Sequence, residues 1–329
     1  MLRALGLGDL LAGVPALRAL AVAFPEHRRV LAAPAVLAPL ARLSGAVEEV
    51  WDTRPLAPLP PVAARAAVAV NLHGRGPESH RVLLAAAPER LVAFRHPDVP
   101  ETARAPAWRA DEHEAARWCR LLEASGMPAD PARLELPAPE GAPPPGTAGA
   151  TVVHPGAASP ARRWPPERWA TVARAERRRG RRVVVTGGAE ERALARDVAR
   201  LAGLAPEAVL AGRTDLLGLA RTVAVARVVL CGDTGVAHLA TALGTPSVVL
   251  FGPTDPAHWG PPPSPRHRVL WAGRRGDPHG PEPDPGLLRI TPADVRAALD
   301  ALEGDPAAAP RARRGRAADA VRAAPTAGP

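Results

Sequence analysis

The sequence of 329 residues has no lysine, no tyrosine and no glutamine, so all 42 of its basic residues are arginine. They outnumber the 33 acidic residues and give a net charge of +9, which permits contact with nucleic acid or an anionic membrane. Aromatic residues, however, make up only 3% of the chain and do not alternate with arginine as they do on base-stacking surfaces. We therefore predict that most arginine side chains face solvent and do not contact nucleic acid.

Cysteine is also scarce. The two cysteines, Cys119 and Cys231, lie far apart in apolar surroundings, which is typical of buried free thiols in a reducing compartment. No stretch reaches transmembrane length and no signal-peptide pattern opens the chain. We expect a cytoplasmic monomer, and the composition also allows peripheral contact with the inner membrane face.

Metal-binding patterns are lacking as well. The sequence has no pair of aspartates flanking a single residue, no C-x-x-C and no H-E-x-x-H. We therefore expect neither a metal site nor another cofactor.

The chain divides at a stretch of five prolines, PAPEGAPPPGTAG, which predicts a semi-rigid linker over 137–149. Short apolar runs alternate with helical patterns on both sides, and this alternation predicts two doubly wound α/β domains with parallel sheets. We place the domains at 1–136 and 150–303, followed by a basic, disordered tail at 304–329. The expected strands are Leu2–Leu5, Val30–Ala33, Ala67–Leu72, Leu91–Phe94, Thr151–His154, Arg182–Thr186, Val209–Leu210, Val228–Cys231, Ser247–Phe251 and Val269–Trp271.

Three predicted helices have informative ends. Leucines at helical spacing follow Gly8, and Pro15 inside this run predicts either a kink or a regular helix that begins only near Gly13. A second helix is expected to begin at an Asp111 cap, and a last one at Thr291. With few residues before the first turn, the strand at Leu2–Leu5 is expected to be weak.

The most informative segment is CGDTGVAHLATALGTPSVVLFGPTDP at 231–256. A buried strand leads into Asp233, Thr234 and Gly235, and an apolar helix follows. Such a helix directs unpaired N–H groups and a positive dipole end toward a bound anion, and His238 lies on its first turn. An ordinary capped helix explains the pattern about equally well.

Other turns carry polar residues at the ends of expected strands. Asp9 follows the Gly6-x-Gly8 turn, where the residue pattern by itself favours a cap of the next helix. Leu11 stands where a dinucleotide fingerprint needs its third glycine, so that motif is excluded. Asn71 and His73 end a strand of the first domain, where an acceptor-binding role and simple turn formation are equally plausible.

Two motifs together resemble glycosyltransferase family 9, the heptosyltransferase-like enzymes: DTGVAHLA followed by VVLFGPTDP, and HPGAAS at 154–159 followed by RRWP at 162–165. The resemblance implies a GT-B fold and an inverting, metal-independent transfer with Asp9 as the catalytic base. It also implies that the C-terminal domain binds the nucleotide-sugar donor. The donor residues it implies are Arg162 (a lysine in the family), Asp233, Thr234, Gly235 and His238. Thr186 and Gly187 end another expected strand, where the turn either lets a nucleotide base or ribose lie against the backbone or is an ordinary strand–helix connection.

We therefore expect a nucleotide diphosphate sugar, preferably an ADP-sugar, as donor and a glycan or glycolipid as acceptor. On the acceptor side, our own interpretation is that Asn71 and His73 face the second substrate. Two alternatives stay open at this point. One is a sugar-nucleotide epimerase or hydrolase on the same fold, and the other is a non-catalytic protein that binds a nucleotide sugar or nucleic acid.

Overall fold

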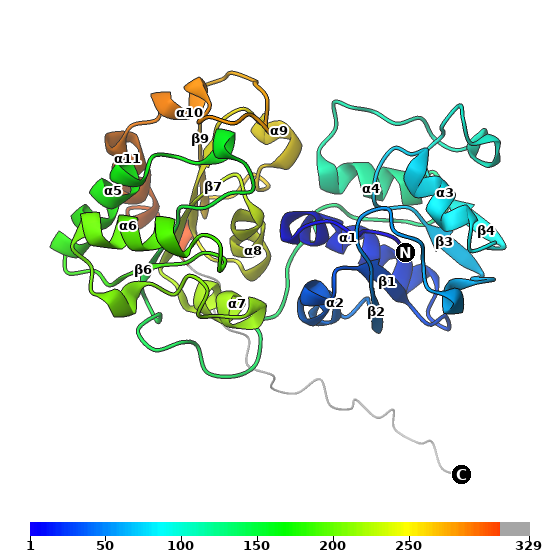
Figure 1. Cartoon of the computed structure of the whole chain (residues 1–329), viewed down its shortest axis with the longest axis horizontal. Coiled ribbons are helices and arrows are strands. Elements are labelled where there is room, and N and C mark those ends of the chain that lie inside the picture. The colour runs from blue at the N-terminus through cyan, green and yellow to red at the C-terminus, as the bar shows by residue number, and fades with distance from the viewer. Residues whose placement is uncertain (310–329) are drawn as a thin grey trace, which may run out of the picture.

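A computed structural model describes residues 1–309, which form two α/β lobes (Figure 1). The first lobe contains two parallel strand pairs, β1–β2 and β3–β4, and Leu2 forms parallel bridges to Ala32 and Asn71 between them. Its elements are α1 (Leu7–Ala23), β1 (Val30–Ala33), α2 (Ala38–Leu43), β2 (Glu49–Asp52), β3 (Val68–Val70), α3 (Glu78–Leu84), β4 (Arg90–Val92) and α4 (Glu114–Glu123).

The strand expected at Leu2–Leu5 is reduced to the bridge at Leu2. Beyond it the Leu5 amide donates to the Arg3 carbonyl at 2.9 Å, so the backbone bends toward the start of α1. Helix α1 runs without interruption from Leu7, and the alternative of a start near Gly13 is therefore wrong. Pro15 lies inside α1 and lacks the N–H that would donate to the Leu11 carbonyl.

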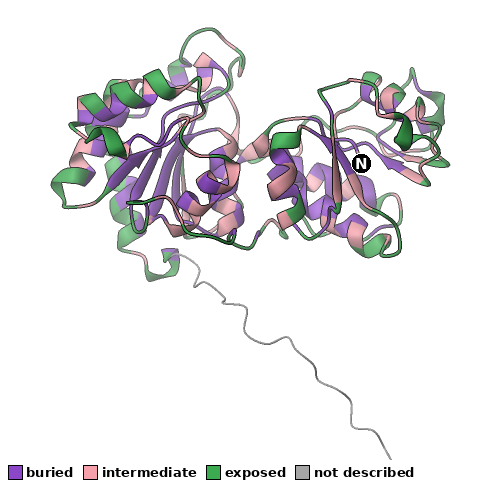
Figure 2. Ribbon diagram, turned by 60° about the horizontal axis from the view of Figure 1, so that its bottom comes forward, coloured by how far each residue is buried: buried purple, intermediate pink, exposed green. Residues whose placement is uncertain are grey.

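The second lobe has one five-stranded parallel sheet in the order β6-β5-β7-β8-β9. The sheet residues of β5 to β8 are all buried, and helices with exposed outer faces cover the sheet (Figure 2). Its elements are β5 (Thr151–His154), α5 (Pro166–Arg178), β6 (Val183–Val185), α6 (Arg192–Ala202), α7 (Leu216–Val225), β7 (Val228–Gly232), α8 (Gly235–Leu243), β8 (Ser247–Phe251), α9 (Pro256–Trp259), β9 (His267–Trp271), α10 (Pro285–Arg289) and α11 (Pro292–Glu303).

Strand order reverses in this sheet between β5 and β7. The chain leaves β5 toward β6 on one side and returns to β7 on the other. In open parallel sheets, ligands bind outside the carboxyl ends of the strands at such a reversal. The residues that follow β5, β6 and β7 are therefore the first place to look for a site.

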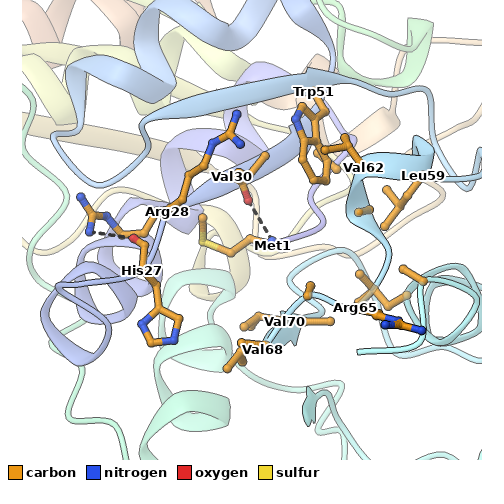
Figure 3. Close-up of a pocket in the computed structure, with 18 of the residues that line it drawn as sticks. Met1, His27, Arg28, Val30, Trp51, Leu59, Val62, Arg65, Val68 and Val70 are labelled. Atoms are coloured by element: carbon orange, nitrogen blue, oxygen red, sulfur yellow. Dashed lines mark hydrogen bonds between the residues drawn. The ribbon is translucent and has the colours of Figure 1, made fainter. Parts of the chain in front are cut away.

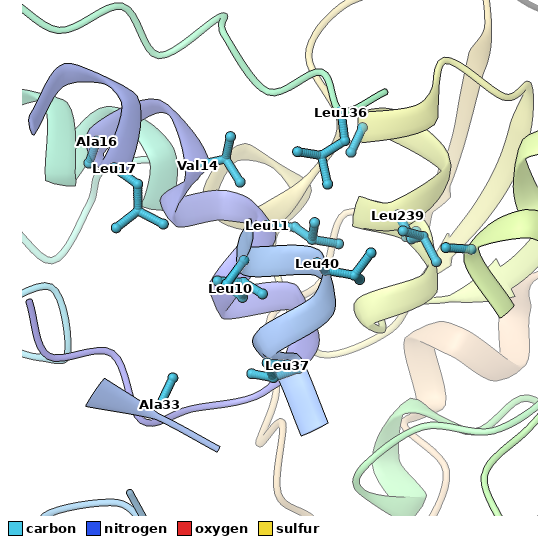
Figure 4. Close-up of a cluster of buried hydrophobic side chains, with 14 of the residues drawn as sticks. Leu10, Leu11, Val14, Ala16, Leu17, Ala33, Leu37, Leu40, Leu136 and Leu239 are labelled. Atoms are coloured by element: carbon cyan, nitrogen blue, oxygen red, sulfur yellow. The ribbon is translucent and has the colours of Figure 1, made fainter. Parts of the chain in front are cut away.

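The two lobes share an apolar core. Helix α1 packs against α4 within its own lobe and against α8 of the other lobe. Leu11 and Leu40 approach Leu239 and Leu136 at this junction (Figure 4). The Leu136 amide also donates to the Ala242 carbonyl at 2.7 Å. Burial of these side chains holds the lobes together through the hydrophobic effect.

The ends of two predicted segments differ from expectation. Residues 304–309 of the expected tail include a short 3-10 helix, Pro306–Ala308, whose Ala308 is buried against the second lobe, whereas residues 310–329 lie outside the described residues. Asp111 is not the cap of α4, because the His113 side chain accepts the Ala115 amide there. Within residues 1–309, every helix falls short of the length and apolarity that crossing a bilayer requires.

Candidate functional site

The N-termini of α1 and α8 meet at the junction of the lobes. A Cβ added to Gly8 would lie 2.9 Å from His238 Cδ2, and one added to Gly235 would lie 3.1 Å from the Gly8 amide nitrogen. Glycine at both positions is what permits this approach. Two positive helix ends therefore point into one region, which favours an anion between them.

Asp9 lies on the first turn of α1, with its side chain 29% exposed. One carboxylate oxygen accepts the Gly6 amide at 3.2 Å, which closes the first turn of the helix. The other oxygen lies 3.7 Å from an Arg3 nitrogen. The carboxylate is thus held at the lobe junction and still reaches solvent.

Arg3 is fully buried and links three elements around Asp9. Its guanidinium donates to the backbone carbonyls of Asp9 and Leu72 and, at 3.0 Å, to the carboxylate of Glu114 on α4. It also lies 5.2 Å from the ring centroid of Trp118. Burial by itself raises the pKa of Glu114, but the charges of Arg3 and Arg117 outweigh it and hold that pKa below its ordinary value.

Sequence reasoning missed this network. The available signal was Arg3 itself, a charged residue within a short apolar run. Arginine is almost never fully buried unless it is paired, so a buried Arg3 implies a partner. Its partner Glu114 stands 111 residues away along the chain, so no local pattern identifies it.

The carboxyl end of β7 brings Asp233 and Thr234 beside Arg162. The Arg162 guanidinium lies 3.7 Å from the Asp233 carboxylate and donates to the Asp233 carbonyl at 3.4 Å. Its buried Nε has no hydrogen-bond partner among residues 1–309. The Thr234 side chain makes no capping hydrogen bond to α8. A cation and uncapped helix amides therefore face the same region, and an oxyanion would satisfy both.

A second polar cluster lies at the ends of β5 and β6. His154 Nδ1 is 3.0 Å from the Thr186 hydroxyl, and its Nε2 is 3.9 Å from the Glu191 carboxylate. Glu191 also accepts the Gly188 amide at 2.8 Å. Burial lowers the pKa of His154, while the charge of Glu191 opposes this shift. Glu191, which sequence reasoning also missed, brings a carboxylate next to Thr186 and Gly187.

His238 stands between the two lobes. Its ring packs edge-on against Trp259 at a centroid distance of 5.9 Å. Burial lowers the pKa of His238, and the charges of Asp233 and Asp9 oppose this effect. The imidazole is thus neutral near pH 7 and offers one N–H donor and one acceptor. Carboxylates from both lobes act on this single ring.

Asn71 and His73 occupy the turn after β3. Asn71 is fully buried, and its side chain donates to the Gly74 carbonyl at 3.2 Å and accepts the His73 amide at 2.8 Å. The His73 Nδ1 is buried without a hydrogen-bond partner in the described part of the chain. Burial and the charge of Arg3 lower the pKa of His73, while Asp9 opposes them. Asn71 therefore shapes the turn that brings His73 close to Asp9.

A second contact bridges the lobes at the N-terminus of α4. Asp111 lies 2.8 Å from His258 Nε2, and His113 Nε2 lies 3.0 Å from the Gly260 carbonyl. The interaction with His258 and the charge of Arg275 lower the pKa of the Asp111 carboxyl. These polar contacts and the apolar core hold the junction at two places.

The predicted site residues thus fall into three groups. Asp9, Arg162, Asp233, Thr234, Gly235 and His238 surround the meeting point of α1 and α8. His73 joins them from β3, and Asn71 supports it. Thr186 and Gly187 lie farther along the edge of the second sheet, with His154 and Glu191.

Comparisons with known proteins identify the family and the fold. The sequence model of glycosyltransferase family 9 (heptosyltransferase) matches residues 101–283. A search of curated proteins finds no significant match.

Solved structures share the fold over nearly the whole chain. A glycosyl transferase family 9 protein from Veillonella parvula is 21% identical with a TM-score of 0.74, covering 92% of this chain and 96% of that one. The E. coli ADP-heptose LPS heptosyltransferase II is 21% identical with a TM-score of 0.69, covering 91% and 96%. The E. coli heptosyltransferase WaaC with ADP is 20% identical with a TM-score of 0.67, covering 91% and 98%. The expected GT-B fold with parallel sheets is confirmed.

Proposed function

The chain belongs to glycosyltransferase family 9 and is a glycosyltransferase, and on this premise we propose that it is an inverting, metal-independent enzyme. The proposed reaction moves a heptose-like sugar from a nucleotide diphosphate sugar to a glycan or glycolipid. The observation that carries the proposal is the convergence of two helix N-termini with a carboxylate, Asp9, beside them. This arrangement binds an anionic leaving group next to a proton acceptor.

The donor diphosphate is proposed to bind at the N-terminus of α8. Uncapped amides, the small Gly235 and the unpartnered Nε of Arg162 support this placement. Asp233 orients Arg162, and the neutral His238 supplies a further N–H donor. As the C1–O bond breaks, these fixed donors stabilise the charge that develops on the diphosphate.

The nucleoside is proposed to lie along the ends of β5 and β6, against Thr186 and Gly187. Glu191 is placed there to accept hydrogen bonds from ribose hydroxyls, because its carboxylate faces this edge. An ADP-sugar is the favoured donor, since one structural relative is an ADP-heptose LPS heptosyltransferase and another is a heptosyltransferase with ADP.

Asp9 is proposed as the general base. The Asp9 side chain is partly exposed, which allows an acceptor hydroxyl to reach the carboxylate; the carboxylate takes the proton while the oxygen attacks C1. Attack from the side opposite the diphosphate inverts the configuration. Arg3 positions Asp9 through the backbone, and His73 contacts the acceptor through its unpartnered ring nitrogen.

One chain supplies every group in this scheme, which supports a monomer as the active form. Two buried free cysteines support a cytoplasmic location, with the acceptor in solution or at the inner membrane face.

The test is a thermal-shift screen against ADP-, UDP- and GDP-sugars, followed by transfer assays. A donor at 100 times its dissociation constant adds about 2.7 kcal/mol to the free energy of unfolding. We expect the largest shift with an ADP-sugar. The alternative outcome is that, in the absence of acceptor, the donor is converted to its epimer or to free sugar as fast as sugar is transferred when acceptor is present. That result would instead establish an epimerase or hydrolase.

A further inference from the structure

The backbone that leads to Asp9 gives this residue little support. In residues 1–9 the sheet bridges are those of Leu2, and the Leu5 amide turns back to the Arg3 carbonyl at 2.9 Å. Beside Met1, at the amino ends of β1 and β3, lies a cavity of about 280 Å³ with largely apolar walls (Figure 3). The position of Asp9 therefore depends strongly on side-chain contacts, and Arg3 supplies the most central of them.

Arg3 holds three segments with one buried guanidinium. It donates to the Asp9 carbonyl and to the Leu72 carbonyl, which directly precedes His73. Its third contact is the Glu114 carboxylate, at 3.0 Å. The proposed base and the proposed acceptor contact therefore both depend on where Glu114 holds this guanidinium.

Glu114 is the first residue of α4, and its carboxylate is fixed on both sides. One oxygen accepts from Arg3 and, at 2.8 Å, from the Trp118 indole N–H, while the other accepts from Arg117. Because this buried carboxylate has two cationic partners, separating it from either is costly. A shift of the first turn of α4 is therefore passed on to Arg3.

His113, the residue before Glu114, makes two contacts with one ring. Its Nδ1 accepts the Ala115 amide at 3.2 Å and so caps α4. Because Nδ1 accepts, the ring proton is on Nε2, which donates to the Gly260 carbonyl of the second lobe at 3.0 Å. The same imidazole thus fixes the start of α4 and joins it to the other lobe.

Gly260 connects this contact to the proposed donor groups. It is buried and ends the short helix α9. The preceding residue, Trp259, packs edge-on against His238 at the N-terminus of α8. The cap of α4 therefore meets the second lobe beside the groups that are proposed to hold the diphosphate.

We propose that His113 is a positioning residue, which couples the contact between the lobes to the placement of Asp9. The connection runs from the Gly260 carbonyl through the His113 ring to the start of α4. From there it continues through Glu114 and Arg3 to the proposed base. This inference rests on the proposed role of Asp9, and it ties proton removal to the state in which the two lobes are in contact.

Two substitutions separate the two contacts of the ring. His113→Asn keeps an acceptor in the place of Nδ1, and asparagine is a good helix cap, but no atom takes the place of Nε2. His113→Gln carries an amide N–H at the ε position that can donate to Gly260, and it has no acceptor at the δ position.

The two variants should therefore fail in different measurements. We expect His113→Asn to lower kcat about tenfold, with KM for the donor unchanged and the melting temperature within about 1 °C of the wild type. His113→Gln should keep kcat within about twofold and should melt about 2 °C lower, because the cap of α4 is lost.

Amide exchange in the first turn of α1 gives a readout that does not depend on catalysis. It should be about threefold faster in His113→Asn and unchanged in His113→Gln. Asp111→Ala is the matched control, because it removes a cross-lobe pair with His258 only two residues away. The Asp111 side chain is 86% exposed, so its loss should leave kcat and exchange at the wild-type values.

Wild-type exchange in His113→Asn would overturn the coupling, and wild-type kcat would overturn its role in transfer. Equal losses of kcat in the Asn and Gln variants would also contradict the proposal, because the cap would then be responsible instead of the cross-lobe bond. Failure of the proposed function looks different: Asp9→Asn would transfer sugar at the wild-type rate. In that case the exchange rates of the two His113 variants still decide whether the coupling exists.

Discussion

The two lobes differ in how their sheets are made. The second lobe has five hydrogen-bonded parallel strands, and four of them are buried along their whole length. In the first lobe two strand pairs are joined through Leu2 alone. The proposed donor groups thus stand on a continuous sheet, whereas Asp9 depends on α1 and on the buried Arg3. A regular sheet holds the proposed phosphate-binding groups in fixed positions. In the first lobe a few buried polar contacts hold Asp9 in position instead.

The sharpest test of this difference is Asp9→Asn. The amide keeps the size of the side chain and cannot take a proton, so turnover should fall by about 10²–10⁴ while donor affinity stays unchanged. The measurements are single-turnover transfer and donor titration. Wild-type turnover would show that Asp9 only caps α1, and the base would then have to be sought around His73.

Arg162→Ala tests the donor lobe in the same way. Loss of a charge-assisted hydrogen bond to phosphate should weaken donor binding by about 1.5–3 kcal/mol, or ten- to a hundredfold. The affinity for the free nucleoside should hardly change. Arg178→Ala, on the exposed end of α5, is the matched control and should bind the donor normally. Equal losses for nucleoside and nucleoside diphosphate would contradict a phosphate contact.

Gly8→Ala tests whether the two lobes must touch. The added methyl would lie 2.9 Å from His238 Cδ2, so either the His238 ring or the helix that carries it must shift. We expect kcat/KM to fall about tenfold, since misplacement of reacting groups is costly. Alanine favours helix more than glycine does, so helix formation itself should not suffer.

Gly304→Ala is the control for this change, because its added methyl meets only the Asp300 carbonyl at 3.6 Å. It should leave kcat/KM at the wild-type value. Unchanged kcat/KM in the Gly8 variant as well would mean that the junction adapts without cost to the site.

The last prediction concerns the free energy of unfolding and its dependence on pH, and not activity. Burial, together with the charge of Arg266, lowers the pKa of His267 on β9 to about 4. In the unfolded chain His267 binds a proton near pH 6.5, whereas in the folded chain it does so only near pH 4. The free energy of unfolding therefore falls as the pH drops through this window. His267→Asn should recover about 1–2 kcal/mol of the loss between pH 7 and pH 5.

Denaturant unfolding at the two pH values measures this recovery. The exposed His279→Asn provides the control and should follow the wild type. A loss of equal size in the His267 variant would show that other groups carry the pH dependence.

Sequence patterns were most informative in the second lobe. The strands at 228–232 and 247–251 are buried on both faces, so their sequences are continuous apolar runs. Such runs are easy to recognise in a sequence. The strand β2 was missed because its residues Glu49–Asp52 are half exposed and partly charged. The helix cap was assigned to Asp111 instead of His113, since aspartate is the commoner cap and its cross-lobe partner His258 is distant in sequence.

The site was predictable where it depends on local turns. Thr234 and Gly235 begin a helix at the end of a strand as expected, because glycine, threonine and strand burial are all local signals. The Arg3–Glu114 pair and the approach of Gly8 to Gly235 were not predictable. Both depend on how distant segments pack, which a single sequence does not encode in any short pattern.

The apolar junction of α1 with α8 has a consequence for how the molecule melts. Side chains of both lobes belong to one core, so neither lobe can unfold without exposing the partner's apolar surface. Heating should therefore produce a single cooperative transition, with equal calorimetric and van't Hoff enthalpies, rather than two separate steps. A chain of two lobes then behaves thermodynamically as one unit.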